Sequence, residues 1–255
     1  MTLTLAPLIN FPLVNPGDDL GVLIQDALRE NILELQNGDI LVLAQKIVSK
    51  AENRLVNLTS ITPSATALRY AEETGKDPRL LELILSESKQ VLRTRKNLII
   101  VEHNLGFVCA NAGIDHSNVH GSWGDPEDWV LLLPKNPDES AERIREYLEA
   151  STQTRVGVLI IDSHGRAWRL GTAGTSIGLS GLPGLVDLRG KPDLFNYRLR
   201  VTTVAAADEL AAAASLVMGQ ANERTPVVLA RGFPYTLREG KLEELIRPEE
   251  LDLFR

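Results

Sequence analysis

The chain has 255 residues, of which 44% are hydrophobic, so it is long enough to bury the core of one large domain or two smaller ones. Its formal net charge of -7, without a run of basic residues, excludes a general nucleic-acid-binding protein, because such proteins hold phosphates with clustered Lys and Arg. The only cysteine, Cys109, excludes an internal disulfide. The apolar tracts at 40–43 and 156–161 are too short to cross a membrane, and the N-terminus lacks the pattern of a signal peptide, so we expect a cytoplasmic protein.

The first half of the chain is expected to begin with a helix and a buried strand. Apolar residues at helical spacing from 20 to 28, behind the cap residue Asp19, predict the helix. A short β-branched tract at 40–43 follows a turn and predicts the strand. Two packing helices are expected next, at 64–74 and at 77–85, because a glycine closes the first and a proline opens the second.

The second half alternates between expected strands and helices. A glycine-rich stretch from 171 to 184 suits close backbone approach or sharp bends more than a helix. The other expected elements are strands at 98–101, 130–133, 156–161, 199–204 and 226–230, helices at 138–150 and 208–218, and a short surface helix at 243–254. No internal repeat or low-complexity linker divides the chain, so we expect a single domain over residues 1–255, with two subdomains as a variant.

The segment 111–118, Asn-Ala-Gly-Ile-Asp-His-Ser-Asn, is the most informative polar cluster. Its small residues present Asp115 and Asn118 three positions apart, just after a strand-like stretch. A carboxylate and an amide supply the hard oxygen ligands that suit Mg²⁺ or Mn²⁺, which bind one or two carboxylates together with substrate phosphates. An Asx-rich turn without a ligand is the alternative interpretation.

Asp162 and Ser163 directly follow the most apolar expected strand. The carboxyl ends of strands in open sheets are common ligand sites, so these residues are a second candidate for the same metal site. The alternative is that Asp162 only opens a β-turn.

Lys46 and Lys50 follow the buried strand at 40–43 at a spacing of four, so in a helix both ammonium groups lie on one face. That arrangement suits nucleotide phosphates, although a solvated lysine face paired with Glu52 is the alternative. Neither a P-loop nor a Rossmann glycine motif occurs in the chain, so any phosphate site must be built differently.

Two other kinds of chemistry are poorly supported by the sequence. His116 and His120 lie four apart, as zinc ligands on a helix do, but Gly121 and the small polar residues between them disfavour a helix. A serine hydrolase would need Gly-x-Ser-x-Gly, and the segment 174–178, Gly-Thr-Ser-Ile-Gly, has the wrong phase.

Several longer motifs follow one another along the chain in a fixed order. They are Phe11-Pro12-Leu13-Val14, Gly17-Asp18-Asp19-Leu20, the segments at 38–42 and 48–52, the octapeptide at 111–118, Asp162-Ser163-His164-Gly165-Arg166, and the segments at 178–181, 207–210 and 218–220. In this order they closely resemble the coenzyme F420:L-glutamate ligase family, also called the F420 gamma-glutamyl ligases, nearly from end to end. Asn-Ala-Gly-Ile-Asp-x-Ser-Asn is the most specific of the motifs.

The resemblance implies an α+β fold of mixed β-sheets with flanking helices, specific to the family, in an intertwined homodimer with the site near the subunit interface. It also implies GTP as co-substrate, two divalent ions (Mg²⁺ or Mn²⁺), and K⁺ as a further candidate ion. The nitroreductase-like extension of some bacterial relatives is not expected here. The positions that contact GTP in the family correspond to Phe11, Pro12, Leu13, Val14, Gln45, Lys46, Lys50, Asn118, Met218, Gly219, Ala221 and Thr225. The metal positions correspond to Asp115, Asp162, Ser163 and Gln220.

The family chemistry implies that GTP phosphorylates a carboxylate of the deazaflavin precursor, and that the amine of L-glutamate then displaces phosphate. Asp115, Asp162 and Lys50 would serve this transfer. The chain departs from the family at Ser163, where many relatives have Thr, and at Gln220, where others have Glu and therefore a charge. The loop at 120–128 is longer than the family pattern, so substrate choice could differ there.

Three alternatives remain at this point. The first is a ligase of the same family that acts on another acid or amino acid, and the second is a catalytically silent homologue that binds nucleotide or metal. The third, from a different class, is a zinc hydrolase that uses His116 and His120. The number of glutamates added, the preference for GTP over ATP and the physiological metal are open.

Overall fold

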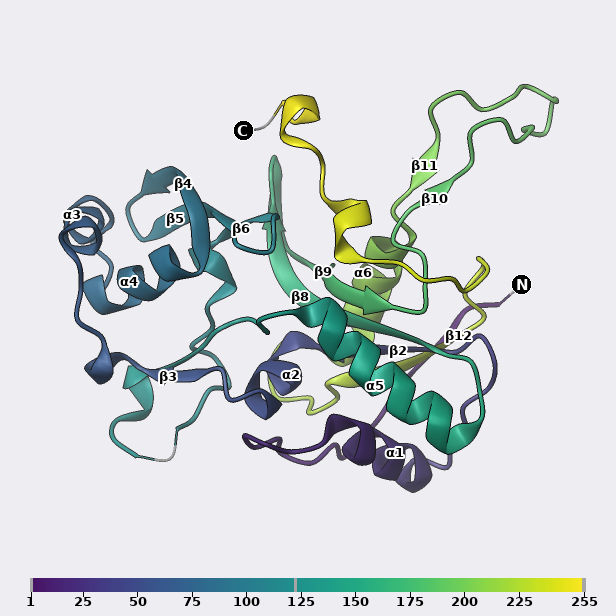
Figure 1. The fold of residues 1–255 in the computed structure, drawn as a ribbon, viewed down its shortest axis with the longest axis horizontal. Helices are drawn as coiled ribbons and strands as arrows, with labels where there is room; N and C mark the ends of the chain where they lie inside the picture. The colour runs from purple at the N-terminus through teal and green to yellow at the C-terminus, as the bar shows by residue number, and fades with distance from the viewer. Residues whose placement is uncertain (1, 122, 254–255) are drawn as a thin grey trace.

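The computed structural model describes residues 2–121 and 123–253 and has a mixed α+β architecture (Figure 1). Its largest sheet has five strands in the order β1-β12-β2-β8-β9. Only β2 and β8 pair in parallel, and the other neighbours are antiparallel. The strands are β1 (Thr4–Pro7), β2 (Ile40–Ala44), β8 (Gly157–Arg166), β9 (Arg169–Ser180) and β12 (Val227–Arg231).

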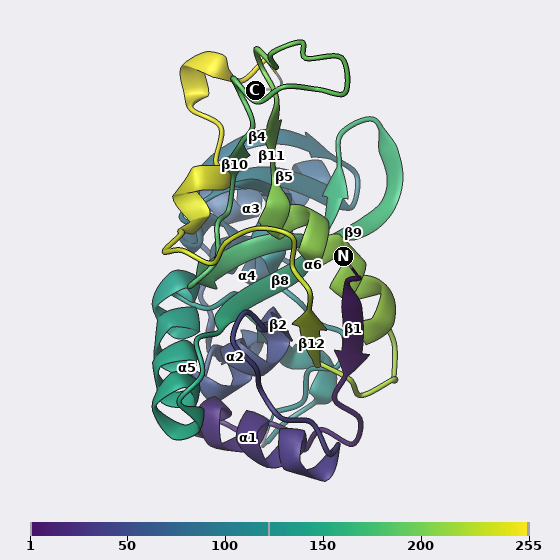
Figure 2. The ribbon, with the colours of Figure 1, turned by 90° about the vertical axis from the view of Figure 1, so that its right-hand side faces the viewer.

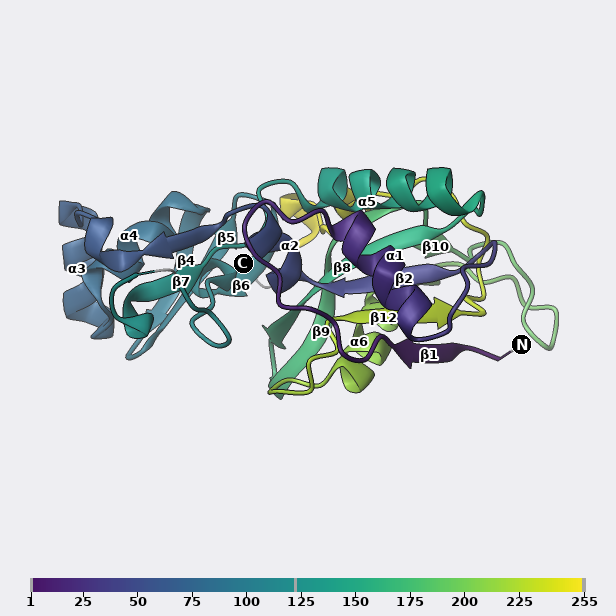
Figure 3. The ribbon, with the colours of Figure 1, turned by 90° about the horizontal axis from the view of Figure 1, so that it is seen from below.

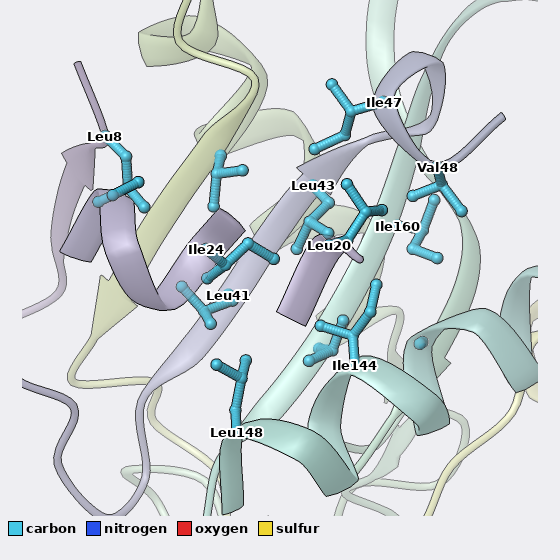
Figure 4. Close-up of a cluster of buried hydrophobic side chains, with 14 of the residues drawn as sticks. Leu8, Leu20, Ile24, Leu41, Leu43, Ile47, Val48, Ile144, Leu148 and Ile160 are labelled. Carbon is cyan, nitrogen blue, oxygen red and sulfur yellow. The ribbon is translucent and has the colours of Figure 1, made fainter. Parts of the chain in front are cut away.

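Helices cover both faces of this sheet because its central strands are apolar on both sides. On one face, α1 (Leu20–Glu30) and α5 (Pro137–Thr152) pack their apolar stripes on Leu41 and Leu43 of β2 (Figure 4). On the other face, α6 (Ala206–Met218) packs on Ile40 and Val42 of the same strand. Figures 2 and 3 show α5 and α6 on opposite sides of the sheet. Alternate residues of β2 therefore belong to two different cores.

A second group of elements, the smaller lobe, lies beside the large sheet at the end where α2 (Gln45–Ala51) is found (Figure 1). It is built on a three-stranded antiparallel sheet in the order β4-β5-β6 with two helices packed against it. Its elements are α3 (Ala65–Thr74), α4 (Pro78–Ser86), β4 (Ser88–Arg95), β5 (Leu98–His103) and β6 (Val108–Ala110). A two-stranded ladder, β3 (Leu55–Asn57) with β7 (Trp129–Leu131), also belongs to this part of the chain.

The helices expected at 20–28, 64–74 and 77–85 are confirmed with their caps, and those expected at 138–150 and 208–218 form as α5 and α6. The side chain of Asp19 accepts hydrogen bonds from the first turn of α1, Ser64 caps α3, and Gly75 ends α3 in the left-handed conformation. Pro78 occupies the first turn of α4. The described residues contain no helix that is long and apolar enough to span a membrane.

The glycine-rich stretch is largely the long strand β9, which the sequence did not predict, although the expected close backbone approach is confirmed. A Cβ at Gly174 would lie 2.4 Å from the carbonyl oxygen of Ala211 in α6, and one at Gly178 would lie 2.5 Å from the backbone of Pro137 in α5. These two glycines therefore let both helices lie directly on the strand.

Two other predictions are wrong in extent. Of the strand expected at 199–204, only β11 (Thr203–Val204) forms, paired with β10 (Val186–Asp187) at the base of an arm that leaves the body of the molecule (Figure 1). Its apolar residues have no sheet to pack on, and Val201 is 86% exposed. The helix expected at 243–254 is replaced by two 3₁₀ turns, Leu242–Leu245 and Glu249–Leu251, and residue 254 lies outside the described residues.

Candidate active site

Four segments of the chain meet at one edge of the five-stranded sheet. Strands β2 and β8 are parallel, and their last paired residues are Ala44 and Ile161. The next residues along the chain, Gln45 and Asp162, therefore lie at the same end of the sheet. The antiparallel strand β12 begins at this edge, with Val227 opposite Leu43, and β1 ends there, beside the start of β12. The carboxyl ends of parallel strands are a common place for ligand sites in sheets of this kind.

The helix α2 (Gln45–Ala51) begins directly at the end of β2 and turns Gln45 toward the neighbouring lobe. Gln45 is buried, and its Oε1 accepts a hydrogen bond from Oγ of Ser49 at 2.8 Å. That bond fixes the amide, so its Nε2 donates to Oδ2 of Asp115 at 2.7 Å. A side chain at the edge of the large sheet thus holds a carboxylate from the other part of the molecule.

Asp115 is anchored through its backbone to β7, where it exchanges hydrogen bonds of 3.0 and 2.9 Å with Leu131. The preceding turn contains three consecutive residues with positive φ, Asn111, Ala112 and Gly113. This conformation is uncommon for residues other than glycine, and it occurs at sites where geometry matters more than local stability. A Cβ at Gly113 would lie 2.6 Å from the side chain of Leu133, so this turn packs tightly on the protein.

The carboxyl group of Asp115 is in an environment that favours its neutral form. Burial and the negative charge of Asp162 raise its pKa to about 6, against the opposing effect of Lys46, whose Nζ lies 3.4 Å from Oδ1. A buried carboxylate whose pKa is raised by a neighbouring carboxylate marks a place where a cation is stabilised.

Lys46 and Lys50 project from the same face of α2, as their spacing predicts, and both contact the loop after Asp115. Nζ of Lys46 donates to the carbonyl and to Oγ of Ser117, at 3.0 and 2.8 Å, and Nζ of Lys50 donates to the carbonyl of Asn118 at 2.8 Å. Burial and the neighbouring Lys46 lower the pKa of Lys50. Glu52 instead accepts a hydrogen bond from Arg143, at 2.7 Å.

Asp162 and Ser163 are adjacent in β8 and point to opposite faces of the sheet. Oδ2 of Asp162 lies 3.0 Å from Nε2 of His164, on the side of the sheet that meets β6. Oγ of Ser163 donates to Oε1 of Gln220 at 2.8 Å, on the side of α6. The four residues expected to bind metal therefore form two groups, Asp115 with Asp162 and Ser163 with Gln220.

The remaining expected residues lie around the same edge. On the loop that follows β1, Phe11 and Val14 are buried. Pro12 is exposed, and Leu13 is 73% exposed. The loop after α6 is held by bonds within itself and to Asn118. These bonds are Thr225 Oγ1 to the carbonyl of Met218 (2.9 Å), the amide of Ala221 to Glu223 Oε2 (2.8 Å), and Asn118 Nδ2 to the carbonyl of Ala221 (3.0 Å). Gly219 ends α6 with a φ of +73°.

The donor set fits a hard cation better than zinc. The described residues contain no group of three His, Cys, Asp or Glu side chains that could form a protein-only metal cage. Two carboxylates near two lysines instead match the way Mg²⁺ binds, with substrate phosphates completing its shell. His116 and His120 lie in an exposed, non-helical loop, and Ser176 lies inside strand β9, so neither forms the constellation that the zinc or serine hydrolase would need.

The sequence interpretation did not single out His164 or the ring that it contacts, Phe107. A signal for His164 was present, because alternate residues of a strand share a face and His164 follows Asp162 by two. Cys109 also lies near Asp162, and burial together with that charge raises the pKa of its thiol to about 12. The thiol is therefore protonated and unsuited to act as a nucleophile.

Comparison with known proteins defines the class of this site. Residues 8–232 match the family model of F420-0:Gamma-glutamyl ligase, an enzyme family of the ligase class. The coenzyme F420:L-glutamate ligase of Methanothermobacter thermautotrophicus is 48% identical over 257 residues, covering 100% of both chains. The chain belongs to the F420-0:gamma-glutamyl ligase family.

Two further relatives have the same printed description, coenzyme F420:L-glutamate ligase. The protein of Methanocaldococcus jannaschii is 47% identical over 221 residues, covering 87% of this chain and 86% of its own. That of Archaeoglobus fulgidus is 39% identical over 255 residues, covering 100% of this chain and 97% of its own. The family resemblance that the sequence motifs predict is confirmed over the full length of the chain.

Proposed function

We propose that this protein joins L-glutamate to the deazaflavin precursor of coenzyme F420 through an amide bond, in a reaction driven by GTP. The observation that carries the proposal is the meeting of Lys46, Asp115 and Asp162 at one edge of the sheet in a chain of this family. Carboxylates and ammonium groups placed together suit the transfer of a phosphoryl group, in which charge moves between phosphate oxygens.

The lysines of α2 are the proposed phosphate ligands. Lys46 and Lys50 now donate to loop oxygens of Ser117 and Asn118, and phosphate oxygens are stronger acceptors for the same ammonium groups. Burial of Lys50 strengthens its interaction with an anion, because less water competes for the charge. The base and ribose of GTP would lie between the loop of Phe11 to Val14 and the loop of Met218 to Thr225.

Asp115 and Asp162 are the proposed ligands of one divalent ion, and Ser163 with Gln220 those of a second, with Mg²⁺, Mn²⁺ or additionally K⁺ as occupants. When bound, such ions neutralise the charge on the nucleotide phosphates. Gln45 keeps Asp115 in place for this role through its bond to Oδ2. Because Gln220 is uncharged, the second position depends more on the phosphates for its affinity than the first.

The reaction itself needs positioning and charge stabilisation but no covalent protein intermediate. A carboxylate oxygen of the precursor attacks the γ-phosphorus, the bond to GDP breaks, and an acyl phosphate forms. The amine of glutamate then attacks the acyl carbon and expels phosphate, which leaves the amide. Lys46 and Lys50 hold the phosphate oxygens in line during the first step.

We further propose that the protein works in the cytoplasm as a single-domain, intertwined homodimer. The arm from Asp187 to Thr203 supports the dimer, because along its length it exposes large apolar side chains that the other described residues do not cover. Leu194 is 96% exposed, Phe195 89% and Val201 86%. Several large apolar side chains exposed together on a projecting arm are typical of protein interfaces.

The test is to incubate the protein with deazaflavin precursor, L-glutamate, GTP and Mn²⁺, and to measure both GDP release and the mass of the product. Glutamate-dependent GDP release with a mass gain of one or more glutamyl residues supports the proposal. GTP binding without turnover would instead identify a silent homologue, and GDP release with another acid or amino acid would identify a changed substrate.

A further inference from the structure

His164 is held rigidly beside Asp162 without serving any step described above. Its Nε2 lies 3.0 Å from Oδ2 of Asp162. The ring is buried, and Nε2 makes no hydrogen bond within the described residues. A buried polar atom without a partner costs about 1–3 kcal/mol, so its place beside a carboxylate calls for a reason.

The ring of His164 packs against Phe107, which in turn stacks on His103; these three rings are called the aromatic stack below. Phe107 contacts the His164 ring with ring centroids 5.2 Å apart and an interplanar angle of 50°. Phe107 also stacks on His103, with ring centroids 5.2 Å apart and the rings nearly parallel, at 10°. Phe107 also packs against the cores of both faces of the large sheet and against the core of the smaller lobe.

The far end of the stack is fixed by backbone bonds. Nδ1 of His103 accepts a hydrogen bond from the amide of Leu105 at 3.0 Å. The turn from His103 to Phe107 is closed by a 2.9 Å bond between the amide of His103 and the carbonyl of Phe107. The β5–β6 turn therefore fixes His103 and Phe107, and Phe107 limits the rotation of the His164 ring.

We propose that His164 is a positioning residue that sets the orientation of the Asp162 carboxylate. A small rotation of either group lets Nε2 donate to Oδ2, which leaves Oδ1 of Asp162 free for a divalent cation. Groups that hold a ligating carboxylate in this way raise metal affinity, because the ligand does not have to be ordered when the ion arrives. This inference rests on the proposed metal role of Asp162.

The positions of Asp162 and Asp115 both depend on the smaller lobe. Asp115 belongs to the segment that follows β6, and the turn that fixes His164 precedes β6 in the same small sheet. Both carboxylates are therefore positioned by one lobe, Asp162 through the rings and Asp115 through the chain.

The test is to titrate Mn²⁺ by electron paramagnetic resonance into the full chain without other substrates, which reads metal affinity rather than activity. The variants are His164→Leu, which removes the nitrogen, His164→Gln, whose amide nitrogen can replace Nε2, and Asp162→Asn. Phe107→Leu removes the stacked ring. Phe233→Leu is the matched control, because Phe233 is an equally half-buried aromatic residue beyond the opposite end of β12.

We expect His164→Leu to weaken Mn²⁺ binding by roughly tenfold to a hundredfold, His164→Gln to restore much of the loss, Phe107→Leu to weaken binding less, and Phe233→Leu to leave it unchanged. If His164→Leu binds Mn²⁺ as tightly as the wild type while Asp162→Asn binds it more weakly, the role of His164 is overturned but the metal role of Asp162 stands. Equal losses in the Leu and Gln variants would also overturn it, because only the bulk of the ring would then matter. Absence of Mn²⁺ binding by the wild type would overturn the proposed metal site itself.

Discussion

Nε2 of Gln45 donates a 2.7 Å hydrogen bond to Oδ2 of Asp115, and this bond joins the edge of the large sheet to the smaller lobe. Gln45 is buried, and its other amide atom is held by Ser49. The amide therefore has no freedom to turn away, so the carboxylate of Asp115 keeps one orientation. An arrangement of this kind prepares a ligand group before the substrate arrives.

Gln45→Ala is predicted to lower both activity and stability. The change leaves Oδ2 of Asp115 without its donor and leaves a cavity beside Ser49, at a cost of about 1–3 kcal/mol in the free energy of unfolding. The measurement is urea unfolding together with GDP release. Ser49→Ala is the comparison variant, because it removes the bond that fixes the amide but keeps Nε2 of Gln45 as a donor, so a smaller loss is expected. Equal losses of activity in both variants would contradict the role given to Gln45.

Asp115→Asn is predicted to stabilise the metal-free protein at pH 7 while it abolishes ligation. The folded-state pKa of Asp115, about 6, lies above its ordinary value of 3.8, so its contribution to stability is complete below pH 3.8 and is lost as the pH rises through 6. At pH 7 the buried charge then costs up to about 3 kcal/mol, which asparagine avoids. Melting temperatures at pH 5 and pH 7.5 would check this; a variant less stable than the wild type at pH 7.5 would contradict it.

Lys50→Ala is predicted to weaken GTP binding by roughly tenfold to a hundredfold, since a hydrogen bond from a charged donor contributes about 1.5–3 kcal/mol. Direct titration of GTP in the presence of Mn²⁺ measures the effect. Lys96→Ala, an exposed lysine in the turn between β4 and β5, is the matched control. Unchanged GTP affinity in the Lys50 variant would remove this residue from the phosphate site.

Gly174→Ala is predicted to destabilise the fold by about 1–3 kcal/mol, because the new methyl group would lie 2.4 Å from the backbone of α6. Gly165→Ala serves as the control, since the added carbon meets nothing within 4 Å. Chemical denaturation of both variants compares a position in β9 with one in its paired strand β8. Equal stabilities would show that α6 does not lie as close to β9 as described.

The helices and the central strands could be predicted from the sequence because their signals are local. Asp19 and Ser64 cap helices whose apolar stripes follow at once, and β2 is apolar enough to be buried on both faces. Strand β9 could not be predicted, because its glycines weaken the local preference for a strand and are explained only by the helices that lie on them. The arm at 187–203 was partly mistaken for a strand, because its apolar residues are exposed and none of the described residues packs on them.

The candidate site was predictable where it depends on strand ends. Gln45 follows β2, and Asp162 lies just beyond the part of β8 that pairs with β2, so their position after apolar tracts was informative. The strand expected to end at 161 instead continues to Arg166, so Asp162 does not follow a strand. The division of Asp162 and Ser163 between two faces also follows from strand alternation. The pairing of Gln45 with Asp115 was not predictable, because it joins residues 70 positions apart through the packing of two lobes.

The proposed mechanism depends most on the activation of a carboxylate by phosphoryl transfer, and an isotope label tests this step directly. The precursor is prepared with ¹⁸O in its terminal carboxylate and incubated with GTP, L-glutamate and Mn²⁺, and the released phosphate is examined by mass spectrometry. We predict one ¹⁸O atom in the phosphate, since the carboxylate oxygen that attacks the γ-phosphorus leaves with it. Unlabelled phosphate alongside amide product would contradict an acyl phosphate and, with it, the proposed role of the site.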